Sequence, residues 1–260
     1  MIYISIFRRI KIEVIMFDQP RLIHLSPDGP DTEGLTQLDL EPAEFQSPLP
    51  VQNAHIFYED ATIGLTVGVW DTTEMQETFG PYPGDEFICM LQGQFAMVDA
   101  QGDAVPAGKG DAVAFRNGAP MSWKQEGYLK KFFVTYLDPN GPVPQIATAQ
   151  EAVIVLDPHA QLSDVSDSGQ TRERTHVAFT NDAKNMPAGV WKSGAADYGM
   201  SIFTVRKFVR VLEGEATIIE HDGKVHYVTA NDYFFIPKGT ECQWKIQKYM
   251  KTTYAQIDAG

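Results

Sequence analysis

The chain is short of cysteine, and this excludes several kinds of site. Its 260 residues contain two cysteines, Cys89 and Cys242. Two cysteines cannot form a disulfide framework or a cysteine-based zinc site. Both lie in apolar, strand-like runs, so we expect buried free thiols in a reducing compartment.

Basic residues and long apolar runs are also scarce. The chain has 21 Lys and Arg against 34 Asp and Glu, a formal charge of −13. Phosphate binding needs a basic face, so no nucleic-acid partner is expected. No apolar run reaches the roughly 18 residues that cross a bilayer, so we expect no membrane partner and a cytoplasmic location. In residues 1–16 the basic cluster follows the apolar stretch, the reverse of a secretory signal. We interpret them as a mis-assigned start before Met16 or as a loose extra strand.

An internal repeat is the strongest signal that is present. Gly68-Val69-Trp70 recurs as Gly189-Val190-Trp191, an offset of 121 residues. The same offset joins Gly93 to Gly214, Asp111 to Asp232, Gly118 to Gly239 and Trp123 to Trp244. The chain is therefore predicted to be a tandem duplication: an N-terminal extension (1–40), a first barrel (41–145) and a second barrel (146–260). The stretch 138–142, rich in proline and glycine, marks the joint.

Within each copy the pattern is that of an all-β fold. Short apolar runs separated by turn residues occupy 86–91, 95–99, 111–115 and 130–136 in the first copy, and 208–212, 216–220, 233–237 and 251–257 in the second. Strands at this spacing, with no helical period between them, favour a sandwich or barrel with few and short helices.

Both copies resemble cupins, small jelly-roll barrels with two motifs around a central cavity. Glu86 with Gly93 seven residues later, followed by Gly110-Asp111 and Gly118, is similar to the two motifs. The second copy has the counterparts Gly214, Asp232 and 237–239. Among cupins, these motifs are similar to those of ethanolamine-utilisation cupins and of ureidoglycine aminohydrolase. The resemblance implies two tandem jelly-roll barrels, a bicupin, and association into a homodimer.

The resemblance also implies a divalent metal held by several imidazoles and a carboxylate, which this sequence does not supply. The first-motif histidine positions fall on Gly80 and Tyr82, or on Phe79 and Pro81 with the longer spacing, and the second-motif histidine on Met121. Only Glu86 remains. In the second copy the carboxylate position is Lys207, whose charge repels a cation. We therefore predict no metal and no cofactor in either copy.

The predicted site is the interior of the first barrel. Strand alternation directs Glu86, Ile88 and Met90 inward, opposite the second-motif strand. An apolar pocket with a few convergent polar groups is typical of a small-molecule site. The predicted catalytic residues are Glu86 and Lys131, and the predicted ligand-binding residues are Tyr82, Arg116, Met121, Trp123, Gln125, Lys207 and Trp244.

Each of these residues also has a structural interpretation. Glu86 could instead form a buried ion pair with Lys131 or Arg116. Trp123 and Trp244 could be barrel core.

Three functions remain open. The first is a bicupin that binds or transforms a small polar metabolite in the first barrel without a typical cupin metal site. The second is a non-catalytic ligand-binding or scaffold bicupin. The third is a metal-dependent hydrolase similar to ureidoglycine aminohydrolase. Whether either barrel is catalytic is left open.

Overall fold

The computed structural model describes residues 19–30, 34–138, 148–164 and 173–259. The described chain divides into two compact units. The first unit consists of Ser26–Val155 with Asn181–Ala183, and the second of residues 19–25, 156–180 and 184–259. The N-terminal 16 residues and most of the predicted joint lie outside the described residues.

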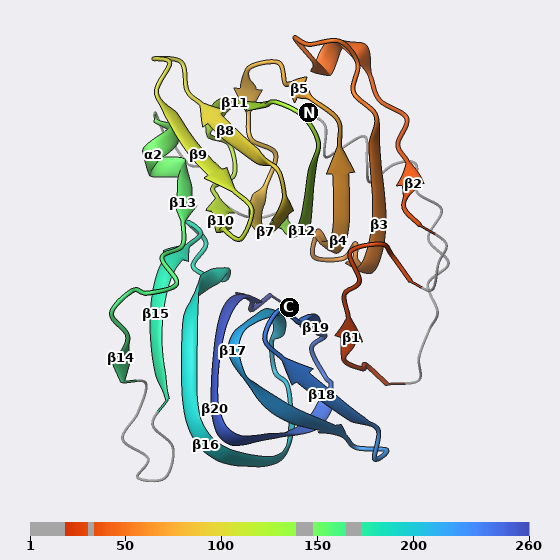
Figure 1. The fold of residues 1–260 in the computed structure, drawn as a ribbon, viewed down its shortest axis with the longest axis vertical. Coiled ribbons are helices and arrows are strands. Elements are labelled where there is room, and N and C mark those ends of the chain that lie inside the picture. Colours follow the sequence, from red (N-terminus) through yellow and green to blue (C-terminus); the bar gives the residue numbers. More distant parts are fainter. Residues whose placement is uncertain (1–18, 31–33, 139–147, 165–172, 260) are drawn as a thin grey trace. The chain divides into compact units, whose positions relative to one another are not determined.

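The first unit has two sheets (Figure 1). One has the strand order β13-β10-β7-β12-β4-β3-β2, and the other the order β5-β11-β8-β9, with β6 paired to β11. The strands are β2 (Thr36–Gln37), β3 (Gln52–Asp60), β4 (Leu65–Thr72), β5 (Met75–Gln76), β6 (Gly80–Pro81), β7 (Asp85–Gln92), β8 (Gln94–Val98), β9 (Ala104–Gly108), β10 (Ala112–Phe115), β11 (Pro120–Gln125), β12 (Leu129–Tyr136) and β13 (Val153–Val155).

The second unit has one sheet in the order β1-β19-β17-β20-β16-β15-β14, with β18 paired to β17. Its strands are β1 (Ile23–His24), β14 (Ser163–Asp164), β15 (Arg174–Thr180), β16 (Pro187–Ile202), β17 (Arg206–Glu220), β18 (Val225–Thr229), β19 (Tyr233–Ile236) and β20 (Glu241–Ile257).

The predicted all-β, jelly-roll class is confirmed, and the helices among the described residues are short. They are η1 (Pro42–Glu44) and α2 (Ala149–Ala152). None of the helices in the described part is long and apolar enough to cross a membrane.

One strand prediction was wrong. The runs 208–212 and 216–220 belong to the single strand β17, which passes Gly214 without a hairpin. Gly214 has φ 79°, and the pairing of β17 with β20 shifts register between Gly214 and Thr217. A glycine in the left-handed region lets the strand bulge and continue.

The strand pairing repeats with the offset found in the sequence. Glu86 lies opposite Thr135 on β12 and Phe115 on β10. Lys207, 121 residues later, lies opposite Gln256 on β20 and Ile236 on β19. The register shift between Ile56 and Tyr58 likewise recurs between Val177 and Phe179. Positions 121 residues apart therefore occupy equivalent places on the strands of the two units.

Each unit has its own apolar core, formed by the residues that strand alternation directs inward. Ile88 and Met90 belong to the first core, and Val209 and Val211 to the second. Cys89 and Cys242 are buried free thiols, as predicted.

Part of the predicted N-terminal extension is built into the second unit. Strand β1 pairs with β19. The carboxylate of Glu220 accepts hydrogen bonds from the Leu22 backbone N–H at 2.9 Å and pairs with His226 Nε2 at 3.0 Å. Arg21 pairs with Asp222 at 2.6 Å. A buried carboxylate thus holds the start of the described chain against the sheet.

The turn after β7 predicts a sharp stability difference between two glycines. Gly93 has φ 80°, and an added Cβ would lie 2.4 Å from the Tyr128 carbonyl oxygen. Gly102 has φ 86° but nothing within 4 Å of the same position. We expect Gly102→Ala to lower the free energy of unfolding by about 1 kcal/mol and Gly93→Ala by about 2–3 kcal/mol, measured by urea denaturation. Equal losses at the two sites would contradict this assignment.

Candidate functional site

An ion pair lies in the interior of the first unit. Lys131 Nζ, from β12, is 2.9 Å from Glu86 Oε1, from β7. The Tyr82 hydroxyl donates a hydrogen bond to the other carboxylate oxygen of Glu86. Glu86 is 0%, Lys131 3% and Tyr82 5% exposed. Both predicted catalytic residues are therefore brought together, and the partner of Glu86 is Lys131.

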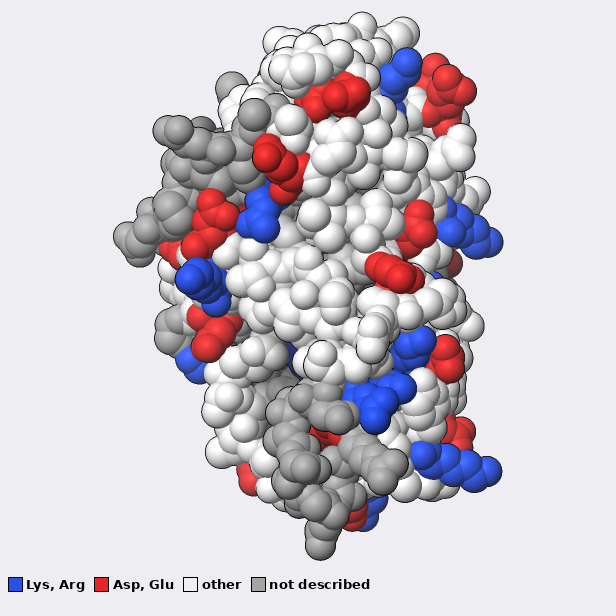
Figure 2. Space-filling model, turned by 90° about the vertical axis from the view of Figure 1, so that its left-hand side faces the viewer, with Lys and Arg blue, Asp and Glu red and all other residues white. Residues whose placement is uncertain are grey.

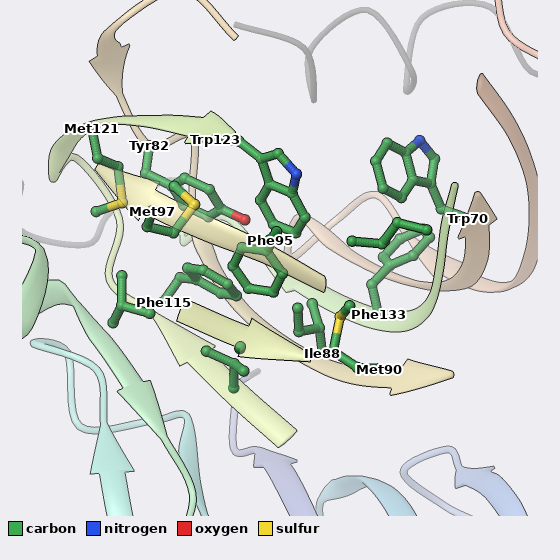
Figure 3. Packing of buried hydrophobic residues seen from close by; sticks show 14 of the residues in the cluster. Trp70, Tyr82, Ile88, Met90, Phe95, Met97, Phe115, Met121, Trp123 and Phe133 are labelled. Carbon is green, nitrogen blue, oxygen red and sulfur yellow. The ribbon is translucent and has the colours of Figure 1, made fainter. Parts of the chain in front are cut away.

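Aromatic rings enclose the ammonium group of Lys131. Its Nζ lies 5.0 Å from the ring centroid of Trp70 and 4.8 Å from that of Trp123. Figure 3 shows the two indoles standing apart, with Phe95 stacked on Trp123 at 3.9 Å. Cation–π attraction of a desolvated ammonium stabilises this arrangement.

The indole N–H groups of Trp70 and Trp123 donate hydrogen bonds to neighbouring side-chain amides. Trp70 Nε1 donates to Gln52 Oε1 at 3.2 Å, and Trp123 Nε1 donates to Gln125 Oε1 at 2.8 Å. The Gln125 side-chain nitrogen in turn donates to the backbone carbonyls of Thr73 and Gly127. Gln125, a predicted ligand-binding residue, therefore orients Trp123 in this structure.

Glu77 was missed by the sequence analysis. Met75 on β5 is in the core, and alternation along the extended chain directs Glu77 to the same side. Glu77 is partly buried, and no described residue forms a hydrogen bond or ion pair with its carboxylate. Burial raises the pKa of Glu77 to about 7, with Lys131 lowering it in part and Glu86 raising it further. Glu77 is thus a partly exposed titratable group whose pKa the buried pair influences.

Arg116 lies outside this group. Its guanidinium pairs with Asp182 at 2.9 Å and donates to the Glu151 carbonyl at 3.3 Å. Met121, a predicted ligand-binding residue, is buried in the same core as Tyr82.

The first unit also has an open surface groove of about 950 Å³. Residues of β5, β8, β9 and β11 line it, Gln76 and Lys124 among them. The described residues that line this groove do not include Glu77, Glu86 or Lys131. The groove is therefore separate from the interior ion pair.

The two predicted residues of the second unit lie in different surroundings. Lys207 Nζ is 5.7 Å from the ring centroid of Trp191 and 4.9 Å from that of Tyr254. Trp244 is buried in the core, with ring centroids 6.2 Å from Phe203 and 5.8 Å from Phe234. No contact between Lys207 and Trp244 is found among the described residues.

The donor chemistry does not fit the divalent metal that cupin motifs imply. One Glu86 oxygen faces the Lys131 ammonium and the other accepts from Tyr82. The remaining motif positions offer the thioether of Met121 and, in the second unit, the cationic Lys207. Within the described ranges no group of three or more His, Cys, Asp or Glu side chains could hold a metal.

The raised pKa of Glu77 predicts the pH dependence of stability. A carboxyl whose pKa rises from 4.5 to about 7 on folding stabilises the protein below about pH 4.5, and this contribution is lost as pH rises through 7. Between pH 5 and pH 8 we expect the wild type to lose about 1–3 kcal/mol of unfolding free energy that Glu77→Gln keeps. Glu74→Gln, at an exposed neighbour, is the matched control and should follow the wild type. Parallel curves for Glu77→Gln and wild type would contradict the assignment.

Comparison with known proteins agrees with this fold. A family model described as an EutQ-like cupin domain matches residues 180–254. The chain is similar to a protein of unknown function of the DUF861 family from Pseudomonas syringae pv. tomato, with 19% identity and a TM-score of 0.72 over 92% of this chain and 100% of that one.

Two further solved structures share the fold. A putative glyoxylate induced protein from Pseudomonas aeruginosa has 10% identity and a TM-score of 0.59, over 97% of this chain and 93% of that one. A cupin 2 conserved barrel domain protein from Leptotrichia buccalis has 11% identity and a TM-score of 0.53, over 82% and 90%. No curated protein matches the chain. Residues 180–254 therefore match an EutQ-like cupin domain, and the chain as a whole shares its fold with solved cupin structures.

Proposed function

We propose that the protein is a bicupin that binds or transforms a small polar metabolite in its first unit, without a typical cupin metal site. One observation carries the proposal: the partly exposed Glu77 carboxyl has a raised pKa, and the buried Glu86–Lys131 pair influences it. A perturbed carboxyl next to a fixed charge pair and aromatic walls is the usual chemistry of a small-molecule site.

In this proposal Glu77 is the reactive group, and Lys131, Glu86 and Tyr82 form a fixed charged group. Glu77, with a pKa of about 7, exchanges protons readily at neutral pH and acts as the general acid or base. The Lys131 ammonium supplies a fixed positive charge, and Glu86 and Tyr82 hold it in place. Because Glu86, Lys131 and Tyr82 are at most 5% exposed, a ligand approaches from the side of Glu77.

A ligand screen tests this proposal. Small carboxylates, amines, ureides and sugars are added at pH 7, and the shift in melting temperature is recorded. We expect at least one class to raise the melting temperature of the wild type. Glu77→Gln should reduce the apparent affinity for that class by about tenfold, the loss of one charge-assisted contact. Glu74→Gln should leave the affinity unchanged. Hits that bind Glu77→Gln as tightly as the wild type would place the site elsewhere.

A non-catalytic scaffold is the second candidate function. The observation in its favour is the closure of the ion pair, since a carboxylate that is 0% exposed with two partners needs no ligand. Under this candidate, the same screen gives no shift in any class.

Metal-dependent hydrolysis, as in ureidoglycine aminohydrolase, is the third candidate, and the donor set disfavours it. Elemental analysis of the purified protein decides it. We expect Mn, Fe, Ni and Zn at well below one atom per chain. A near-stoichiometric metal that Glu86→Gln removes would restore this candidate.

We also propose that the protein is a cytoplasmic homodimer with no nucleic-acid or membrane partner. Light scattering tests the oligomeric state. Basic and acidic side chains are mixed on the face drawn in Figure 2, and among the described residues there no continuous basic surface is visible. This charge pattern supports the assignment of a small-molecule rather than a nucleic-acid ligand.

A further inference from the structure

Among the described residues, none of opposite charge contacts the Lys207 ammonium. No described residue forms a hydrogen bond or ion pair with its Nζ, which lies over the rings of Trp191 and Tyr254. Its side chain is partly buried, so it keeps contact with solvent. An amine with aromatic walls, no ion-pair partner and access to solvent differs from Lys131, which is closed in by Glu86.

The repeat identifies the residues of the first unit that correspond to Lys207 and its neighbours. Position 207 is the counterpart of Glu86, and position 252, the counterpart of Lys131, is Thr252. The aromatic frame is retained, since Trp191 corresponds to Trp70. The second unit therefore keeps one aromatic wall, Trp191, has Tyr254 as the other in place of a tryptophan, and carries an amine in place of the carboxylate.

Polar groups surround this amine at a distance. Trp191 Nε1 donates to the carboxylate of Glu173 at 3.1 Å, and the Tyr198 hydroxyl donates to Ser193 at 2.9 Å. Among the described titratable groups, Glu173 acts electrostatically on Lys207, and the ring of Tyr254 lies against its Nζ. Burial lowers the pKa of Lys207 to about 8, and Glu173 opposes this shift in part. Burial raises the pKa values of Tyr198 and Tyr254, so both hydroxyls stay protonated.

We propose that Lys207 is the nucleophile of a second site, where a small aldehyde or ketone forms an imine with its Nζ. Desolvated lysines in apolar surroundings are the ones that form Schiff bases, because a larger fraction is present as the free amine. The partial exposure of Lys207 gives access to the carbonyl compound, and the rings of Trp191 and Tyr254 shield the product from bulk water. This site is independent of the function proposed for the first unit.

The step balances without a further reactant. The Nζ lone pair forms a bond to the carbonyl carbon, and the π electrons move to the oxygen, which takes up a proton. The nitrogen then loses its protons to solvent, the hydroxyl group leaves as water with one added proton, and a C=N bond remains.

Reductive trapping tests the proposal. The full chain is incubated with propanal and sodium cyanoborohydride, whose hydride reduces the imine to a stable secondary amine, and labelled lysines are located by peptide mass spectrometry. We expect Lys207 to be labelled at least about tenfold faster at pH 7.5 than the exposed Lys109 and Lys124. Its rate should rise with pH to a half-maximum near 8. Lys131, closed in its ion pair, should remain unlabelled.

Two variants test whether fast labelling requires the amine of Lys207, and not only its positive charge or its apolar stem. Lys207→Arg keeps the positive charge, and Lys207→Met keeps the apolar stem; both should abolish the fast labelling. Glu77→Gln should leave it unchanged, so failure here is distinguishable from failure in the first unit. If either variant does not fold, the comparison among lysines of the wild type decides alone. Labelling of Lys207 no faster than that of Lys109 and Lys124 would overturn the proposal.

Discussion

The ion pair between Glu86 and Lys131 is the constraint on which the first unit depends. A carboxylate with no exposure to solvent must be compensated by charge and hydrogen bonds, because an uncompensated buried charge costs several kcal/mol. Lys131 supplies the charge from the neighbouring strand and Tyr82 the hydrogen bond. The positive charge in this interior is a side-chain ammonium. The position of Lys131 in turn affects the pKa of Glu77.

Equivalent tryptophans in the two units lie beside groups of different charge. In the first unit the indole N–H of Trp70 is held by the neutral Gln52, and in the second that of Trp191 is held by the anionic Glu173. Counterparts 121 residues apart that differ in chemistry are Glu77 and Tyr198, Tyr82 and Phe203, Glu86 and Lys207, Lys131 and Thr252, and Phe133 and Tyr254. Between the two copies of the repeat the tryptophans correspond, while several charged positions differ. This pattern favours two sites with separate chemistry over one site and a passive copy.

Much of the architecture could be predicted from the sequence. Apolar runs, turn glycines and the repeat predicted the all-β class, and alternation along β7 and β17 identified the residues that face each core. The partner of Glu86 could not be chosen between Lys131 and Arg116, because the choice depends on pairing between distant strands. Glu77 was missed since β5 has two residues, too few for alternation to be visible. Glu173 was missed because its only sequence signal is its correspondence to Gln52.

A double-mutant cycle on Glu86 and Lys131 tests the central claim most directly. The free energy of unfolding is measured for wild type, Glu86→Gln, Lys131→Met and the double variant. We predict that Lys131→Met alone lowers it by about 3–5 kcal/mol, because it removes the positive charge that compensates the buried Glu86 carboxylate, and that adding Glu86→Gln restores a large part of this loss. Losses that simply add, with the double variant equal to the sum of the two single ones, would contradict the account.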